Sequence, residues 1–443
     1  MLRKAGPPRP DPWSARCFRH RPKTAAAALL LSVIAVCSLL LTGCWGYRET
    51  DETAHVLLLG LEKGKENVLS LTALIAVPRR MGGGGGGGGV GGGGGGGGGQ
   101  KPVITVSVEC RTILTGLDMI NSVIERRATL DHLKVILFSR EIAEEGLDRY
   151  MAPFLRYPQF RRTVYLGVCQ KSCRELLEKF EPVMEANPAK YAELLMGSQK
   201  YVGFIPFNQI HHFVTDWKSK SAEPVCVLVD LEREGEGKEG GKPSGKEEGD
   251  FLAGQLPRKG GNKIEFIGSA VFRGTKMVGT IDGSETVILN VLRGWLKETF
   301  VAFPDPSRPD RFVIVRLLAE RKPKIEVRSG EDGGASIDVR VFLDAEIISV
   351  QSGENYERPD RLAELEKKIN TLLENKTQSL IRKTQEEYRA DIFGFGLKAR
   401  RLAATYPEWQ KLDWPEIYPR AAVSVTYAVK IRRFGLLRKT TVT

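Results

Sequence analysis

The residue best placed for chemistry is Cys44, which ends the motif Leu41-Thr42-Gly43-Cys44. A thiol can be alkylated, and a thioether to diacylglycerol would fix a protein to a membrane surface. Small residues before a cysteine let a peptidase reach the bond, here between Gly43 and Cys44. The motif therefore predicts cleavage before Cys44 and a covalent acyl lipid on its sulfur, with no other cofactor.

The residues that precede Cys44 are typical of an export signal. Residues 1–24 are basic and Pro-rich, and Ala25–Leu41 is an apolar run broken only by Ser32 and Ser38. This order predicts a secretory signal over residues 1–43, and the motif at its end resembles the lipobox of bacterial lipoproteins. An uncleaved membrane anchor and a core helix with a chance cysteine are the alternatives. The lipobox interpretation predicts attachment to the outer face of the cytoplasmic membrane.

Half of the positive net charge of the chain lies in the predicted export signal. The formal net charge of the 443 residues is +12. Residues 1–43 hold seven Lys or Arg and one Asp, a net +6, so residues 44–443 carry the other +6. This mild positive excess suits the surface of an anionic lipid bilayer. Because the charges are interspersed rather than gathered in a stripe, they predict no nucleic-acid partner.

We find no pattern for catalysis or for a resident metal. The sequence lacks the metalloprotease, serine-hydrolase and nucleotide-binding motifs, which predicts a protein that is not an enzyme. Cys169 and Cys173 would lie one turn apart if residues 166–179 were helical. We favour small buried hydrophobes there, with a disulfide or metal site as the alternative. A bridge between Cys110 and Cys226 stays open.

The exported part divides into three predicted regions. Residues 44–197 form a mixed α and β domain, interrupted by the glycine run Gly82–Gly99, which predicts a flexible insertion between two strands. Residues 198–262 form a middle domain or linker, in which Glu232–Asp250 is too polar to fold. Residues 263–443 form a carboxy-terminal α+β domain.

Periodicity predicts particular elements within these regions. In the first domain we expect two strands within 56–77, further strands at 103–108, 132–139 and 163–168, and helices at 115–124 and 141–150. In the last domain, Asp282 and Glu285 have capping-box spacing at the start of a helix. Residues 337–347 and 423–431 alternate as half-buried antiparallel strands, and a long helix from Asp360 to Tyr388 covers the sheet. The expected fold class is α+β, elongated and multi-domain.

Several segments, in order, resemble one protein family. They are Cys44-Trp45-Gly46-Tyr47-Arg48-Glu49, residues 132–141, residues 154–161, residues 268–286, Asp391-Ile392-Phe393-Gly394-Phe395-Gly396, and Pro407-Glu408-Trp409 followed by Trp414. The chain is thereby similar to the Ger(x)C family of spore germination lipoproteins. Three features depart from the family pattern. They are Gly46, the glycine run Gly82–Gly99, and Glu62 in Leu59-Gly60-Leu61-Glu62, where the family usually has Asp.

The resemblance implies a function and partners. Ger(x)C proteins are the C-subunits of spore germinant receptors, which work beside A- and B-type membrane subunits in the inner spore membrane. The resemblance also implies an elongated three-domain α+β architecture. A solute-binding lipoprotein of a transporter is the alternative, and it requires two similar α/β lobes around a cleft. A surface-anchored hydrolase is a third, and it lacks a motif.

The closing signature Asp391–Gly396 has two interpretations. Gly394 and Gly396 can adopt positive φ and turn the chain tightly, so Phe393 and Phe395 can point into a core. Alternatively, both rings are exposed on the turn and contact a membrane subunit, since exposed aromatic patches often mark protein interfaces. We favour the core, and mutation distinguishes the two.

Overall fold

The structure is a computed structural model that describes residues 23–41, 52–66, 68–77, 102–181, 188–232, 249–330 and 334–434. The chain divides into two compact units, Met1–Glu52 and Thr53–Thr443, and the first contributes helix α1 (Lys23–Leu41). No helix in these described ranges is both long and apolar enough to cross a membrane. Gly43 and Cys44, the run Gly82–Gly99 and most of the predicted loop at 232–250 lie outside the described residues.

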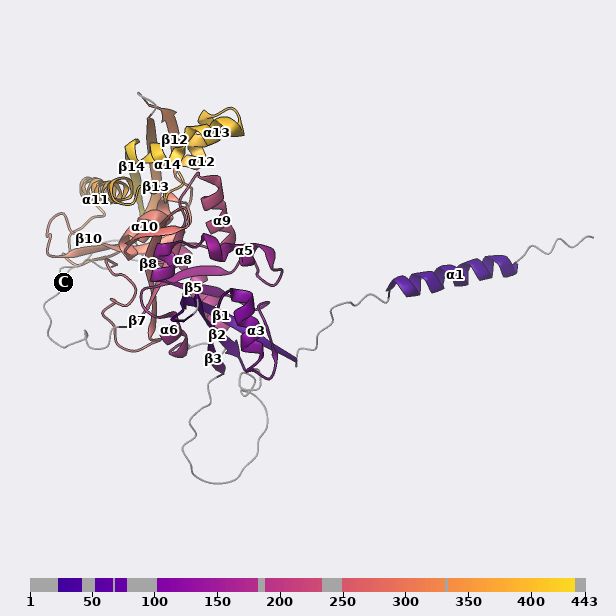
Figure 1. The fold of residues 1–443 in the computed structure, drawn as a ribbon. Coiled ribbons are helices and arrows are strands. Elements are labelled where there is room, and N and C mark those ends of the chain that lie inside the picture. The colour runs from indigo at the N-terminus through magenta and orange to yellow at the C-terminus, as the bar shows by residue number, and fades with distance from the viewer. Residues whose placement is uncertain are drawn as a thin grey trace, which may run out of the picture. The chain divides into compact units, whose positions relative to one another are not determined.

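The first sheet of the larger unit has nine strands and is parallel at its centre (Figure 1). The central strands β1, β5, β6 and β7 are parallel, and antiparallel strands extend both edges. The expected strands are confirmed. The bounds are β1 Thr53–Lys63, β2 Leu69–Ala76, β3 Val103–Cys110, β4 Arg127–Thr129, β5 Val135–Ser139, β6 Tyr165–Cys169, β7 Val225–Leu231, β8 Ile264–Arg273 and β9 Lys276–Ile281.

Helices cover both faces of this sheet, which explains why its central strands are apolar throughout. Every residue of β5 and of β7 is buried, as expected for parallel strands between two helical layers. One face packs against α3 (Ile113–Asn121), α4 (Arg140–Glu145), α5 (Asp148–Arg156) and α9 (Ile210–Ser219). The other packs against α6 (Cys173–Glu178) and α7 (Pro188–Gly197), which leads to the short helix α8 (Gln199–Val202).

Two local predictions need correction. The helix expected over 141–150 is two helices, α4 and α5, because Gly146 between them has φ 123° and cannot continue a helix. Cys169 and Cys173 do not share a helix, since Cys169 ends β6 and Cys173 begins α6. Both are buried and free, as are Cys110 and Cys226, so none of these four is in a disulfide.

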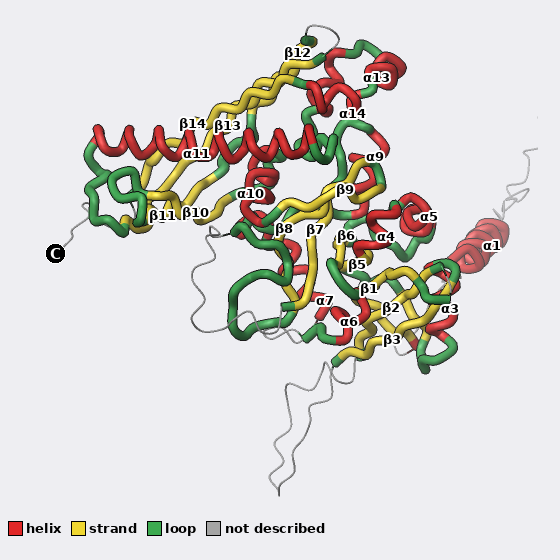
Figure 2. The backbone as a smooth tube through the Cα atoms, turned by 60° about the vertical axis from the view of Figure 1, so that its left-hand side comes forward, coloured by secondary structure: helices red, strands yellow, loops and turns green. Residues whose placement is uncertain are grey.

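The second sheet has five strands, of which β13 is the longest. They are β10 Glu298–Pro304, β11 Phe312–Leu318, β12 Lys324–Ser329, β13 Ala335–Val350 and β14 Ala422–Arg433. One edge of β13 pairs with β12 and then β11, and the other pairs with β14. The predicted long helix is confirmed as α11, Pro359–Glu386, which lies across this sheet (Figure 2). The predicted capping box of Asp282 and Glu285 starts α10, Gly283–Leu292.

The prediction that residues 423–431 form an antiparallel strand is wrong. Among the described strands, β14 pairs with β13, and the pairing is parallel from Ser336 with Ala422 to Glu346 with Arg433. The reason is α11, because a helix that crosses the sheet returns the chain to the end at which β13 began.

Helix α11 also protects the edge strand that it creates. The backbone N–H groups of Tyr427, Val429 and Ile431 donate to the side chains of Glu374, Asn370 and Glu366, at 2.9–3.0 Å. Two residues of strand advance about 6.7 Å and four residues of helix about 6 Å, so the two series stay in step. The side chains of α11 thus accept hydrogen bonds from edge N–H groups of β14 that could otherwise pair with a strand of another chain.

The α+β fold class is confirmed by these two sheets and their helices. The first sheet is hydrogen-bonded from β3 to β9 and therefore runs across both expected domain boundaries, at 197/198 and 262/263. The three-domain division stays a prediction.

The pairing of β2 with β3 makes the glycine run testable. Their ladder closes with Ala76 opposite Val103 and a hydrogen bond of 2.9 Å from Val77 N to Pro102 O. Deleting Gly82–Gly99 leaves six residues between Val77 and Pro102, enough for a hairpin loop. Because closure entropy changes by about 0.6 kcal/mol per doubling of length, we expect the free energy of unfolding to change by less than about 2 kcal/mol. Urea denaturation measures it, and loss of the cooperative transition would contradict the insertion hypothesis.

Candidate functional site

The closing signature is organised by the carboxylate of Asp391, which is buried just after α11. Its Oδ1 accepts the backbone N–H groups of Phe393 (3.1 Å) and Gly394 (2.9 Å). Its Oδ2 accepts the N–H of Gly396 and the indole Nε1–H of Trp414, both at 2.9 Å. Burial raises the pKa of Asp391, while these donors oppose that rise. Four donors to one carboxylate fold the signature into a closed turn.

The turn places both aromatic rings in the core. Phe393 is 2% and Phe395 0% exposed, and their ring centroids are 5.2 Å apart. Gly394 has φ 77°, a conformation that glycine adopts without strain. Gly396 does not have positive φ. It starts the short helix α12 (Gly396–Ala399), and a Cβ there would lie 2.5 Å from both the Ser221 carbonyl oxygen and Trp414 Cδ1.

The tryptophans of the signature fix the following segment against the first sheet's helical layer. Trp414 begins α14 (Trp414–Ile417) and Trp409 lies in α13 (Tyr406–Leu412). Trp409 Nε1 donates to the Ser219 carbonyl oxygen at the end of α9, at 3.3 Å. Both indoles are nearly fully buried. Each of the two tryptophans in the sequence motif therefore fixes its helix to the rest of the fold by burial and by one hydrogen bond.

Arg293, at the end of α10, brings a cation into the same junction. Its Nε donates to the Ile392 carbonyl oxygen at 2.6 Å, and a terminal nitrogen lies 3.1 Å from Asp216 Oδ2. The Arg293 and Asp216 side chains are only 6% and 14% exposed. A buried pair of this kind stabilises only when its remaining donors are satisfied, and here Arg293 also donates to the Glu223 carbonyl oxygen at 3.2 Å.

Glu223 is the titratable group of this junction. Its backbone N–H donates to the Asp391 carbonyl oxygen at 2.7 Å, and its Oε2 accepts the N–H of Gly274, in the β8–β9 turn, at 2.5 Å. Burial raises the pKa of Glu223 to about 7, with a further contribution from the Asp391 charge. The Gly274 N–H and Arg273 act in the opposite direction.

We call this set the signature junction: Asp216, Glu223, Arg293, Asp391 and Trp414. Asp391 and Trp414 belong to the motifs that the sequence itself marks. The other three residues lie up to 175 residues away along the chain, and no local pattern marks them. Gly43 and Cys44 lie outside the described residues. No group of three His, Cys, Asp or Glu side chains in the described ranges could hold a metal ion.

Comparison with protein families identifies the class. The model described as "Spore germination protein N-terminal domain" matches residues 46–231. The model described as "Spore germination B3/ GerAC like, C-terminal" matches residues 267–435. The chain therefore belongs to the Ger(x)C family of spore germination proteins, as the resemblance predicted.

Similar individual proteins come from two Bacillus species. "Spore germination protein KC" of Bacillus subtilis (strain 168) is 25% identical over 93% of this chain and 95% of its own length. "Spore germination protein GerQC" of Bacillus cereus is 22% identical over 69% of this chain and 76% of its own length. The "Crystal Structure of the GerBC protein" matches with a TM-score of 0.48 and 16% identity, over 84% of this chain and 96% of that one.

The Phe393 ring provides a direct test of the two interpretations of the signature. Phe393→Ala should lower the free energy of unfolding by about 3–5 kcal/mol, because it removes a buried aromatic side chain. Leu397→Ala is the control, since Leu397 is 50% exposed nearby and should change stability by less than about 0.5 kcal/mol. Urea denaturation of the full chain measures both. Wild-type stability together with impaired germination would support the interface interpretation, and wild-type behaviour in both assays would contradict both.

Glu223 makes the stability of the protein depend on pH. Its folded-state pKa of about 7 lies above the ordinary 4.5, so the folded state binds more protons between these values and stability falls as pH rises through that window. Glu223→Gln should remove up to about 3 kcal/mol of that fall. Glu364→Gln is the control, because Glu364 is an exposed partner of Arg361 and lies outside the signature junction. Denaturation at pH 5 and pH 7.5 measures the difference, and equal slopes in wild type and Glu223→Gln would contradict this role.

Proposed function

We propose that this protein is a lipid-anchored, non-enzymatic C-subunit of a spore germinant receptor, required for nutrient-triggered germination. It is held on the outer face of the cytoplasmic membrane, the inner membrane of the spore, through an acyl lipid on Cys44. Its partners there are the A- and B-type membrane subunits and the bilayer itself.

The observation that carries this proposal is the order and extent of the family matches. The two germination models follow one another over residues 46–231 and 267–435. A mature lipoprotein would begin at Cys44, and the first match begins only two residues later. The matched part therefore agrees with a signal that ends at Gly43.

The structure supports an interaction role more than a transporter's solute-binding role. A solute-binding lipoprotein needs two similar α/β lobes. Here the nine-stranded sheet has a parallel centre between two helical layers, whereas the five-stranded sheet is mainly antiparallel under one long helix. The signature junction also has the character of an architectural site, because the Asp391 carboxylate is fully engaged by main-chain and indole donors.

The test combines gene deletion with a change at the anchor. Spores that lack the gene should fail to germinate with at least one nutrient of a broad panel, and should still germinate with a nutrient-independent trigger. The wild-type gene should restore the response. A Cys44→Ala gene should not. Its product should lack the lipid mass and should either move to the soluble extracytoplasmic fraction or stay unprocessed, because it has no thiol to carry the acyl chains that anchor the protein.

Cys37→Ala is the matched control, since Cys37 lies in the same amino-terminal segment but outside the motif. It should keep the lipid and the response. Normal germination of the deletion strain over the whole panel would contradict the receptor role. Lipid mass on the Cys44→Ala product would contradict the anchor.

A further inference from the structure

Although charges of both signs are interspersed along most of the chain, two short segments that are distant in the sequence are both basic. Residues 218–220 and 397–413 together hold six Lys or Arg and two acids, a net +4. Residues 44–443 carry +6 in all, so these two segments account for most of the net excess. The cations are Lys218, Lys220, Lys398, Arg400, Arg401 and Lys411, and the acids are Glu408 and Asp413.

Folding brings these two segments together (Figure 1). The first is the end of α9, and the second includes α12 and α13. Trp409 of α13 donates from its Nε1 to the Ser219 carbonyl oxygen, at 3.3 Å. A hollow of about 90 Å³ where the segments meet is lined by Lys218, Lys220 and Tyr406, among others. The two segments therefore form one surface. We call it the cationic face, and it comprises residues 218–220 and 397–413.

The cations of this face have no carboxylate partner in the described part of the chain. None of the six takes part in an ion pair with a described residue. Two of them lie over aromatic rings instead. The Lys218 ammonium is 3.9 Å from the ring centroid of Trp217, and the Arg400 guanidinium is 5.7 Å from that of Tyr406. An aromatic ring leaves the net charge in place, so the face can attract an external anion.

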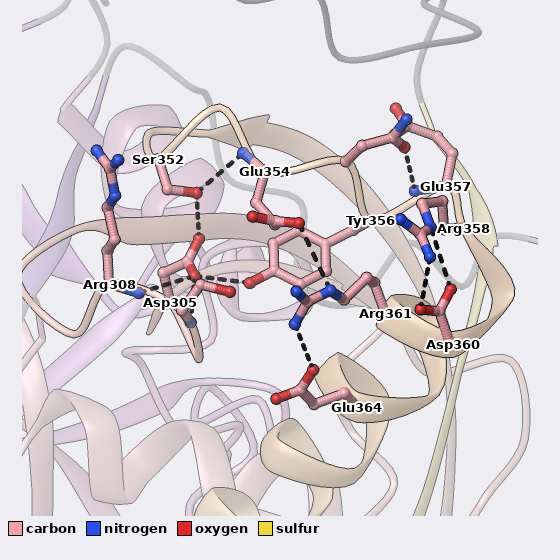
Figure 3. A network of polar contacts seen from close by, with 12 residues as sticks. Asp305, Arg308, Ser352, Glu354, Tyr356, Glu357, Arg358, Asp360, Arg361 and Glu364 are labelled. Atoms are coloured by element: carbon pink, nitrogen blue, oxygen red, sulfur yellow. Dashed lines mark hydrogen bonds and ion pairs between the residues drawn. The ribbon is translucent and has the colours of Figure 1, made fainter.

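The cations at the start of α11 differ in this respect (Figure 3). A terminal nitrogen of Arg358 lies 3.0 Å from Asp360, and Arg361 lies 3.1 Å from Glu364 and 3.6 Å from Glu354. Each of these cations faces a carboxylate, so an external anion would have to compete with a fixed neighbour. No described carboxylate competes in this way on the cationic face.

Exposed apolar side chains lie among the cations of the face. Leu402 is 39% and Tyr406 is 53% exposed. Basic residues interspersed with leucine and tyrosine are typical of surfaces that enter the head-group layer of a bilayer, where the apolar parts are buried and the cations meet phosphates. The core of a protein interface is instead depleted of lysine and of charge in general. The composition of the face therefore favours an anionic bilayer over a protein partner.

We propose that the cationic face binds the surface of an anionic phospholipid bilayer, with lipid phosphates beside its Lys and Arg side chains and with Leu402 and Tyr406 among the head groups. This inference deepens the proposed function and rests on its membrane location, since a lipid on Cys44 would hold the chain at the same bilayer. The anchor would supply attachment, and the face would determine which side of the folded body lies against the lipid. Anionic lipid is needed because its surface potential attracts the cations, within a Debye length of about 8 Å at physiological salt.

Quenching of a fluorescent dye by lipid tests the contact. The mature lipidated chain, with a nitrobenzoxadiazole dye on Leu402→Cys, is held through its anchor on vesicles whose lipids carry a head-group spin label as quencher. The dye attaches to the introduced thiol, because the described cysteines of the mature chain are buried, namely Cys110, Cys169, Cys173 and Cys226. We expect quenching about threefold stronger on mixed phosphatidylglycerol–phosphatidylcholine vesicles than on phosphatidylcholine alone. Sodium chloride at about 1 M should remove the difference, because it shortens the reach of the charges.

A dye on Ile348→Cys is the positional control. Ile348 is 48% exposed and lies at the opposite end of β13 from the part that pairs with β12, and its quenching should not depend on phosphatidylglycerol. Equal quenching at both positions, or quenching at Leu402 that is the same on both kinds of vesicle, would overturn the proposal. Shielding of the Leu402 dye that requires another receptor subunit would identify a protein contact and would overturn it too. Flotation of the chain with the vesicles, measured on the same sample, tests the anchor separately, so a failed anchor and a failed face are distinguished.

Charge variants in the Leu402→Cys chain test the cations. A fourfold variant, Lys218→Gln, Lys220→Gln, Arg400→Gln and Arg401→Gln, should lower the quenching to its level on phosphatidylcholine alone. The pair Arg400→Lys and Arg401→Lys should retain the quenching, because mobile head groups respond to charge and need no fixed geometry. Loss of quenching in the Lys pair would contradict a fluid lipid partner.

The matched control removes cations that already have partners. Arg358→Gln with Arg361→Gln should leave the quenching unchanged, because both arginines face carboxylates. Each variant should show the wild-type thermal transition, since the cations of the face are paired with no described carboxylate. Undiminished quenching of a folded fourfold variant, or an equal loss in the control, would overturn the assignment of the cationic face.

Discussion

The buried carboxylate of Asp391 imposes the geometry on which much of the carboxy-terminal region depends. An anion taken out of water is costly unless hydrogen bonds replace its hydration. The chain supplies three main-chain N–H groups from the next five residues and an indole N–H from Trp414. To do so it must turn at once, with Gly394 in positive φ. The same turn sends Phe393 and Phe395 into the core and brings α12, α13 and α14 back against α9.

Helix α10 connects this junction to an apolar groove of about 410 Å³, which is lined by residues of α10, α11 and the second sheet. Its first turn is closed by Asp282 and Glu285, and its last residue leads to Arg293, which holds Asp216 and the Ile392 carbonyl oxygen. The side of the same helix that carries Val287 and Val291 forms a wall of the groove. A change that moved α10 would therefore disturb both places, because both rely on the position of one rigid element.

The long helix α11 gives the second sheet its mixed character. A strand, a crossing helix and a second strand in one sheet produce a parallel pair, so β14 runs parallel to β13 although the other pairs of that sheet are antiparallel. Glu366, Asn370 and Glu374 then accept the N–H groups along the edge of β14. The helix covers the apolar face of the sheet and its edge at the same time.

The sequence by itself determined the features that each depend on a short stretch of chain. The alternation in β13 and β14, the 3.6-residue stripe of α11 and the capping box of α10 were all readable, because burial on one face leaves a period in the residues. The family was readable too, from ordered motifs that end at Asp391–Gly396 and Trp414. The break at Gly146 was missed, because a glycine within an apolar pattern does not reveal its φ.

Only the tertiary structure decided the direction of β14, the partners of Asp391 and the existence of the groove. Strand direction depends on where α11 delivers the chain, and alternation is the same in either direction. Asp216, Glu223 and Arg293 meet Asp391 from segments that carry no common pattern, so their charges become coupled only when folding excludes water from between them. The groove likewise is a space between three elements, and a sequence pattern records which residues are buried without recording where their packing leaves room.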